Sequence, residues 1–300
     1  MRVAVIGRGD VSVVHLAAIK KLGVTLAGVA THDYRELLDE TKPDVVHICT
    51  PHDQHVPIAL DALARGIHVL LEKPVAHTVE EASQLVAASQ NLKIGVCLQN
   101  RYNATSQAAR NVLRDLGAVT GASATVMWHR DAAYYQAKPW RGQKARSGGG
   151  VLINQAIHTL DLLQWLLGEA SFRDGQIGRL GGLPGDVEDT ATMVLDHAGG
   201  ARSVFFATVT NATDAPVTIE ITAGRGTLLI RGDLTITYRD GRTETVPELR
   251  PDGGGRSYWG ASHELLIADF YRSLADPEPF WIGPREALKA QQLIDQIYRK

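Results

Sequence analysis

The feature that most constrains the fold is a glycine turn directly after the first apolar run of the chain. Gly7-Arg8-Gly9-Asp10-Val11-Ser12 follows an expected strand, Val3–Ile6, and opens an expected helix, Val11–Leu22. Such a turn lets phosphates approach the backbone at a helix N-terminus, and Ser12, in place of a third glycine, is small enough for close packing. The turn predicts a dinucleotide-binding unit; the alternative is a plain tight turn.

The first third of the chain repeats this strand–helix unit. Apolar β-branched runs alternate with amphipathic segments, which predicts a parallel sheet covered by helices. Asp53 and a capping box formed by Thr78 and Glu81 support two of the helix starts. The expected strands are Val3–Ile6, Thr25–Ala30, Val45–Cys49, His68–Leu71 and Lys93–Leu98, and the further helices are Tyr34–Thr41, Pro57–Arg65 and Val79–Gln90.

After Gly117 the pattern changes to that of an α+β domain with a mostly antiparallel sheet. A long strand, Val119–His129, and a glycine-led helix containing Asn154 precede a series of β segments separated by turn residues. These segments are Thr190–Leu195, Ala201–Thr208, Val217–Ala223, Thr227–Ile230, Leu234–Tyr238 and Thr243–Val246, and helices Ser262–Leu274 and Pro284–Tyr298 close the chain. We expect a dinucleotide-binding domain over 1–118 and an α+β domain over 119–283, with helix 284–300 packing back on the first.

Composition excludes several classes of partner. The chain of 300 residues has a formal net charge of −2 and no basic block, which argues against nucleic acid and anionic membranes. It has no apolar run of membrane-spanning length, and Met1-Arg2 leads directly into a strand rather than a signal peptide. Cys49 and Cys97 lie in apolar runs typical of buried, reduced thiols. From these observations together we expect a soluble cytoplasmic protein. His47, His52, His77 and His197 show no metal-ligand spacing with a carboxylate, so we expect no metal.

Two segments carry residues suited to proton transfer between an alcohol and a ketone. Lys73 follows the apolar strand and precedes Pro74, and Asn154, His158 and Asp161 are spaced i, i+4 and i+7 on one expected helix face. The ordinary pKa of histidine, about 6.5, suits a general base. Without a catalytic role, Lys73 would be an ordinary surface lysine and His158 a histidine of the hydrophobic core.

Five segments together support a resemblance to a known family. They are the glycine turn with His15 behind it, Thr50–His55, Gly66–Pro74, Asn154–Asp161, and Glu188-Asp189-Thr190. With them the chain resembles, over nearly its full length, the glucose–fructose oxidoreductase / inositol dehydrogenase / MocA family of NAD(P)-dependent sugar oxidoreductases. The resemblance implies an α/β Rossmann domain and an α+β substrate domain.

The resemblance also implies roles for individual residues. Lys73 and His158 would be catalytic, and a carbohydrate would be the substrate. Residues expected to contact it are Asn154, Asp161, Arg101, Tyr134, Tyr135 and Tyr258, with His263 as a further candidate. Residues expected to bind NAD or NADP are Gly7, Arg8, Gly9, Asp10, Val11, Ser12, Thr31, His32, Thr50, Pro51, His55, Glu72, Lys73, Gln99, Trp140 and Arg141.

The sequence departs from the family pattern in two places. Roughly 20 residues, a helix and a strand, are missing after the second strand by comparison with normal βαβ spacing. The acid expected there to hold the ribose is replaced by Ala30-Thr31-His32, and Asp33 comes slightly late and is at least as suited to cap the helix Tyr34–Thr41, so NAD and NADP both remain open. Asn154 stands where many members have aspartate, which leaves proton transfer to His158.

Three functions are compatible with these motifs. The first is a sugar dehydrogenase or reductase. The second is a redox-neutral glycosidase or epimerase-type enzyme that retains its cofactor, and the third is a non-catalytic ligand-binding module, suggested by the shortened adenosine side. The open sheet of the second domain predicts a homodimer or homotetramer.

Overall fold

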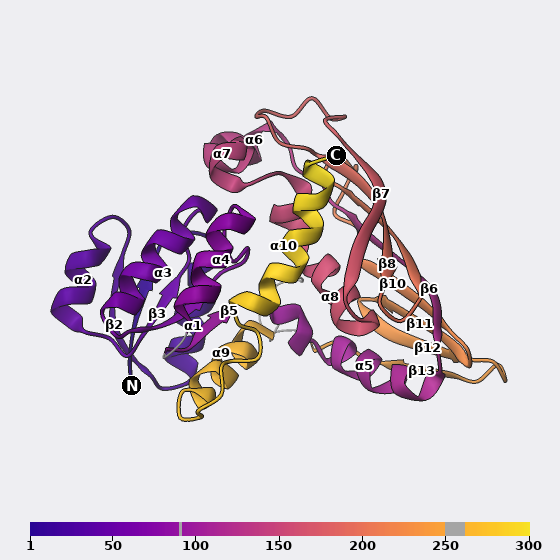
Figure 1. The fold of residues 1–300 in the computed structure, drawn as a ribbon, viewed down its shortest axis with the longest axis horizontal. Coiled ribbons are helices and arrows are strands. Elements are labelled where there is room, and N and C mark those ends of the chain that lie inside the picture. The colour runs from indigo at the N-terminus through magenta and orange to yellow at the C-terminus, as the bar shows by residue number, and fades with distance from the viewer. Residues whose placement is uncertain (90–91, 250–261) are drawn as a thin grey trace. The chain divides into compact units, whose positions relative to one another are not determined.

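The computed structural model describes residues 1–89, 92–249 and 262–300 (Figure 1). Its chain divides into two units. The first contains Met1–Gln99 and the chain from helix α9 (Ser262–Ser273) to Leu288, and the second contains Asn100 through strand β13 (Thr243–Val246) and Lys289–Lys300.

This division differs from the predicted boundary at residue 118. Helix α5 (Ala104–Leu116) belongs to the second unit, because Ala109, Leu113 and Leu116 are buried in its hydrophobic core. The last turns of helix α10 (Pro284–Tyr298) also contribute buried residues to this core, with Leu293 and Ile297 among them. That part of the C-terminal helix therefore packs on the second unit rather than on the first.

The first unit is built on a five-stranded parallel sheet, as predicted. Its order is β2-β1-β3-β4-β5, which reverses direction between β1 and β3. In open parallel sheets, ligands bind at the carboxyl ends of the strands where the order reverses. The strands are β1 (Arg2–Ile6), β2 (Thr25–Ala30), β3 (Val45–Ile48), β4 (His68–Leu71) and β5 (Ile94–Val96), and the helices are α1 (Ser12–Lys21), α2 (Tyr34–Thr41), α3 (His55–Ala64), α4 (Val79–Ala88) and α9.

Strand β2 forms one edge of this sheet. Helix α2 follows it and leads directly to β3, which agrees with the missing helix and strand inferred from the sequence. In the described part of the chain β2 pairs with β1 alone. It is partly exposed along its whole length, whereas β3 is buried throughout.

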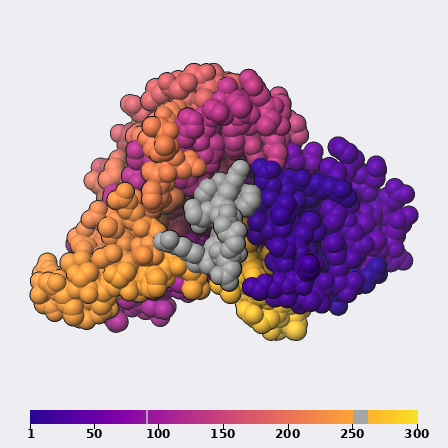
Figure 2. Space-filling view, turned by 180° about the vertical axis from the view of Figure 1, so that it is seen from behind, coloured from indigo at the N-terminus to yellow at the C-terminus, as the bar shows by residue number. Residues whose placement is uncertain are grey.

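The second unit contains an eight-stranded sheet in the order β13-β12-β11-β10-β6-β9-β8-β7. The pairing is antiparallel except between β6 and β9, which are parallel. Figure 2 shows the end of this unit that contains β12 and β13 in orange. The strands are β6 (Val119–Met127), β7 (Ala170–Gly178), β8 (Thr190–His197), β9 (Arg202–Thr208), β10 (Thr218–Ala223), β11 (Gly226–Arg231), β12 (Asp233–Tyr238) and β13, and the remaining helices are α6 (Ala132–Ala137), α7 (Lys144–Ser147) and α8 (Ile157–Leu167).

One face of this sheet packs on helices α5, α8 and the end of α10. Buried residues alternate along the strands, as in β10, where Ile219, Ile221 and Ala223 point into the core. Strand β7 was not predicted, because Arg173, Asp174 and Gly175 interrupt its apolar pattern. No helix among residues 1–89, 92–249 and 262–300 has the length and apolar character needed to cross a membrane.

Candidate active site

The glycine turn lies at the carboxyl end of β1 and is fixed by its neighbours. Gly7 has φ +100°, and a Cβ there would lie 2.4 Å from the carbonyl oxygen of Cys49, so only glycine fits. Its N–H donates to Ala30 O at 2.8 Å, which joins the turn to the end of β2. Ser12 is buried, and its hydroxyl donates to Gly9 O at 2.7 Å. The serine thus closes the turn where a third glycine was expected.

Two buried polar atoms in this unit suit a bound dinucleotide. Thr50 follows β3 and Gln99 lies just after β5, both near the carboxyl ends of their strands. Thr50 Oγ1 and Gln99 Oε1 have no hydrogen-bond partner among the described residues. Leaving such an atom unsatisfied costs about 1–3 kcal/mol. Both residues were expected to contact the cofactor, and a dinucleotide's hydroxyl and amide groups would satisfy them.

The adenosine end of the expected cofactor region is open and basic. Thr31 and His32, which follow β2, are exposed, and Arg8 Nη2 donates to Val29 O at 3.4 Å. Arg35 is held 2.7 Å from Asp61. The same carboxylate accepts from the Tyr34 hydroxyl at 2.5 Å, and burial with this bond raises the pKa of Tyr34 to about 12. Arg8 thus places a basic side chain at the end of β2, where His32 is exposed.

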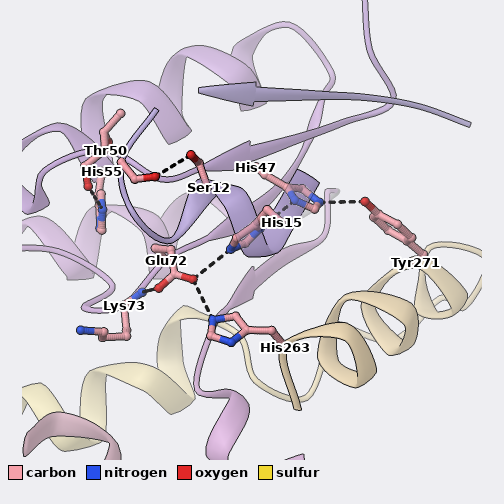
Figure 3. A network of polar contacts seen from close by, with 10 residues as sticks. Ser12, His15, His47, Thr50, His55, Glu72, Lys73, His263 and Tyr271 are labelled. Carbon is pink, nitrogen blue, oxygen red and sulfur yellow. Dashed lines mark hydrogen bonds and ion pairs between the residues drawn. The ribbon is translucent and has the colours of Figure 1, made fainter. Parts of the chain in front are cut away.

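Lys73 stands out in an otherwise buried segment. From Val69 to Ala76 each residue is buried except Lys73, which is partly exposed. It follows β4 at the carboxyl edge of the sheet, and the peptide bond between Lys73 and Pro74 is cis. In Figure 3 its amine extends away from the neighbouring carboxylate of Glu72. The buried segment at the end of β4 therefore has one partly exposed side chain, and that side chain carries an amine.

Both oxygens of the Glu72 carboxylate contact residues of the first unit. His15 Nε2 lies 2.9 Å and His263 Nε2 3.3 Å from Glu72 Oε1, and the Lys73 N–H donates to Oε2 at 3.3 Å (Figure 3). Burial raises the pKa of Glu72, but the bonds to His15 and His263 outweigh it and hold that pKa well below its usual range. His263 is buried, so its expected contact with sugar is replaced by this contact with Glu72.

His15, Glu72 and Cys97 also bring potential metal-ligand atoms within 4.8 Å of one another. Burial and the charge of Glu72 raise the pKa of the Cys97 thiol well above its usual range, which favours a neutral thiol in this structure. The imidazole–carboxylate distances are those of hydrogen bonds. We therefore assign this cluster to hydrogen bonding.

His55 holds two loops of the expected cofactor region together. Its ring is fully buried, with Nδ1 2.8 Å from Pro74 O and Nε2 3.0 Å from Thr50 O. Burial lowers the pKa of His55, and the two carbonyls oppose that shift. Because both ring nitrogens contact backbone carbonyls, His55 positions Thr50 and Pro74, in place of the expected direct contact with cofactor.

The segment with Asn154 and His158 is not a uniform α-helix. Leu152–Ala156 forms a π-helical turn, and helix α8 begins at Ile157, so the i, i+4 spacing of a regular helix does not apply. Each residue from Val151 to Gln164 is buried except Asn154 and His158, which are partly exposed. The sequence placed these two side chains on one accessible face, and their exposure agrees with that.

Glu188 holds the start of this segment. Its carboxylate accepts from Gly150 N at 2.8 Å and Leu152 N at 3.0 Å, and the Tyr298 hydroxyl donates to it at 2.7 Å. A Cβ on Gly150 would lie 1.8 Å from Glu188 O. Burial raises the pKa of Glu188 against these bonds. Sequence reasoning noted Glu188 and the glycines separately but did not pair them.

Arg101 and Asp161, both expected to contact substrate, bind each other instead. Arg101 Nε and Nη2 donate to the two oxygens of Asp161 at 2.8 and 2.6 Å. The two side chains are only 2% and 3% exposed. The two charges are buried away from solvent and neutralise each other. Because Asp161 lies in helix α8, the pair positions that helix rather than a substrate.

The aromatic candidates of the second unit form a small cluster. Tyr134 packs edge-on against buried Tyr135, with ring centroids 5.1 Å apart. The guanidinium of Arg141 lies 4.1 Å from the ring centre of Tyr134, whose hydroxyl accepts from Gln155 at 3.1 Å. Trp140, beside Arg141, is partly exposed. Tyr134 remains accessible in part, Tyr135 is a packing residue, and Tyr258 lies outside the described residues.

Family models match both parts of the chain. Residues 15–99 match an oxidoreductase family with an NAD-binding Rossmann fold, and residues 106–229 match the GFO/IDH/MocA C-terminal domain. A 1,5-anhydro-D-fructose reductase from Ensifer adhaerens is 26% identical over 264 residues, 85% of this chain and 78% of the relative. A levoglucosan dehydrogenase from Pseudarthrobacter phenanthrenivorans is 25% identical over 294 residues, 82% of this chain and 75% of the relative.

Solved structures share the fold. The WlbA dehydrogenase from Bordetella pertussis, in complex with NADH and UDP-GlcNAcA, matches with a TM-score of 0.84 at 25% identity, over 99% of this chain and 95% of that one. Levoglucosan dehydrogenase, in complex with NADH and levoglucosan, matches with a TM-score of 0.82 at 22% identity, over 100% and 96%.

Proposed function

The chain belongs to the GFO/IDH/MocA family of NAD-binding oxidoreductases, and we propose that it interconverts a secondary ring hydroxyl and a ketone of a sugar or sugar derivative. The relatives named above are a 1,5-anhydro-D-fructose reductase and a levoglucosan dehydrogenase, which supports a carbohydrate substrate. The shortened first unit keeps the glycine turn and the end of β4, so the parts expected to face the nicotinamide are present.

One observation supports this proposal most directly. In two buried segments, Val69–Ala76 and Val151–Gln164, the partly exposed side chains are Lys73, Asn154 and His158. Exposing a lysine and a histidine from otherwise buried segments gives no packing advantage. A requirement for contact with a ligand accounts for it.

The chemistry assigns a distinct role to each residue. A bound nicotinamide supplies or accepts the hydride. His158 takes the hydroxyl proton when the alcohol is oxidised and returns it on reduction. The Lys73 ammonium donates a hydrogen bond to the reacting oxygen and stabilises its developing negative charge. Asn154 offers an amide to a neighbouring hydroxyl but cannot act as a base, so the proton step depends on His158.

The cofactor is NAD or NADP. The first carboxylate after β2 is that of Asp33, which comes later than the acid that usually holds the ribose, and Arg8 lies at the end of that strand, so both cofactors remain open. Trp140, Arg141 and the accessible part of Tyr134 provide aromatic and basic groups for the cofactor or the apolar face of a sugar.

Calorimetric titration with NAD(H) and NADP(H) tests the first step. Micromolar binding of one of them supports the proposal and fixes the cofactor. A folded protein that binds none of the four would contradict it and favour a ligand-binding module.

Activity then tests the residues, in a screen of sugars followed at the nicotinamide absorbance. Lys73→Ala and His158→Ala are expected to lower kcat by about 10²–10⁴-fold, the usual contribution of a positioned acid–base group. Lys20→Ala, on the exposed side of α1, is the control and should keep full activity. Near-normal kcat in either site variant would refute the mechanism. Product formed without net change in absorbance would indicate the redox-neutral alternative.

We also propose that the chain forms a homodimer or homotetramer through its larger sheet. Val204 in β9, a strand inside this sheet, is 57% exposed, and Leu229 in β11 is 36% exposed. Exposed apolar residues in interior strands are typical of an association surface. Light scattering after size exclusion measures the mass, and Val204→Lys should reduce it to that of one chain.

A further inference from the structure

A chain of four hydrogen-bonded side chains runs through the first unit from helix α9 to the end of β4 (Figure 3). Tyr271 Oη lies 2.9 Å from His47 Nε2, His47 Nδ1 lies 2.9 Å from His15 Nδ1, and His15 Nε2 lies 2.9 Å from Glu72 Oε1. The two histidines are fully buried, and Tyr271 is partly buried. The mechanism proposed above uses neither Tyr271 nor His47.

The donors and acceptors of this chain point in one direction. Burial raises the pKa of the Tyr271 phenol, so at neutral pH it keeps its proton and can donate it to His47 Nε2. Burial also lowers the pKa of His47, which favours a neutral ring, and if Tyr271 donates to Nε2 the one hydrogen of that ring is on Nδ1. That hydrogen is donated to His15 Nδ1. His15 then carries its hydrogen on Nε2 and donates it to Glu72.

The surroundings of Glu72 require the same direction. Besides His15 from α1, it faces His263 from α9, the backbone N–H of Lys73 and the Cys97 thiol, each of which can donate a hydrogen. The Cys49 thiol, at the end of β3, is also close enough for the Glu72 charge to raise its pKa. A carboxylate is the form of Glu72 that accepts from all these donors.

We propose that Tyr271 and His47 are positioning residues that fix the tautomer of His15 and so hold Glu72 as a carboxylate, and that this fixed negative charge favours the oxidised nicotinamide over the reduced one. The oxidised ring is positively charged and the reduced ring is neutral, so a nearby carboxylate discriminates between them by charge alone. The second half of the proposal rests on the proposed function, in which the end of β4 faces the cofactor.

The tautomers can be read without any cofactor. ¹⁵N NMR of histidine-labelled wild-type protein distinguishes protonated from bare ring nitrogens. We expect His47 to be protonated on Nδ1 and His15 on Nε2 at pH 7.5. The opposite tautomer of either ring, or an imidazolium at His15, would overturn the first half of the proposal. So would stoichiometric zinc in the purified protein, since the cluster would then be a metal site.

The variant Tyr271→Phe tests the effect on the cofactor. It keeps the ring but removes the hydroxyl that donates to His47, so His47 and His15 can reverse their hydrogens. Glu72 then loses one of its donors and binds a proton more readily than in the wild-type protein. The ratio of the Kd values for the oxidised and reduced cofactor should rise by about threefold or more, as expected for partial loss of one nearby charge, and should become pH-dependent. An unchanged ratio would overturn the second half of the proposal.

Tyr238→Phe is the matched control. It removes a phenol–carboxylate hydrogen bond of 3.2 Å to Glu244 on the surface of the second unit, and the ratio should stay at the wild-type value. A wild-type protein that binds neither form of the cofactor would refute the proposed function, while the NMR result would still decide the tautomers. The two failures are therefore distinguishable.

Discussion

The buried ion pair of the second unit allows a quantitative prediction. Asp161→Ala should destabilise this unit by about 3–5 kcal/mol, the usual cost of leaving one partner of a buried pair without the other. The estimate follows from the two bonds of 2.8 and 2.6 Å and from side-chain exposures of 2% and 3%, which keep water from replacing the carboxylate around Arg101. Such a loss is a large part of the total stability of an ordinary domain.

The cost should come from the orphaned charge rather than from a missing attraction. Replacing both partners by apolar residues of similar volume, as Arg101→Met with Asp161→Leu, should therefore recover most of the loss. Recovery in the double variant would separate the pair's role in stability from any direct contact with substrate, because the polar groups are then gone.

Urea unfolding followed by tryptophan fluorescence and circular dichroism measures these free energies. Trp165 is a nearby reporter, since the guanidinium of Arg101 lies 5.8 Å from its ring centre. Asp196→Ala is the matched control, because Asp196 pairs with Arg173 and Arg202 on the surface and should change stability little. If Asp161→Ala costs less than about 1 kcal/mol, in the range of surface pairs, the burial argument is refuted.

Three further predictions follow from the packing, the buried histidines and the basic strand end. Gly150→Ala would place a Cβ 1.8 Å from Glu188 O and should cost about 1–3 kcal/mol in thermal melting, as overpacking does; a melt like that of Gly121→Ala, whose Cβ has room, would contradict this. Burial lowers the pKa of His47 and His55 in the folded state, so the unfolded chain binds protons that the folded chain does not. Stability should therefore fall as pH drops below about 6.5, by up to about 1.4 kcal/mol per pH unit for each histidine, and a melting temperature that rises on acidification would exclude this. Arg8→Ala should weaken NADP(H) about tenfold more than NAD(H) in calorimetry, because an arginine binds a phosphate through charge-assisted bonds; equal losses would show that Arg8 does not face the 2′-phosphate.

Local patterns were enough to predict the parallel sheet, because its signals lie within a few residues of one another. The glycine turn, the apolar run before it and the helix after it predicted β1 and α1 to within one residue at each end. The absence of a helix and a strand could also be predicted from the sequence, because too few residues lie between Ala30 and Val45 to form them in addition to α2.

Contacts between distant residues could not be predicted in this way. His263 lies 191 residues from Glu72 in sequence, and the residues around either one give no sign that the two side chains are in contact. The π-helical turn at Leu152–Ala156 has the same apolar residues as an α-helix, so periodicity assigned it to one. Asp161 was read as a binding residue because its spacing places it on the helix face of Asn154 and His158, and the sequence does not show that Arg101, 60 residues away, neutralises it.

The position of β2 has a consequence for how chain length varies in this fold. A sheet can lose or gain a strand at its edge without a change in the order or pairing of its other strands. Only the hydrogen bonds along that edge change, and the other strand pairs keep their register. Removing a segment after Ala30 leaves the pairing of β1 with β3, and of β3 with β4, as a continuous parallel register. The same edge is thus an insertion point, where a grafted helix and strand would extend the sheet to six strands while the glycine turn and Lys73 keep their places in the existing register.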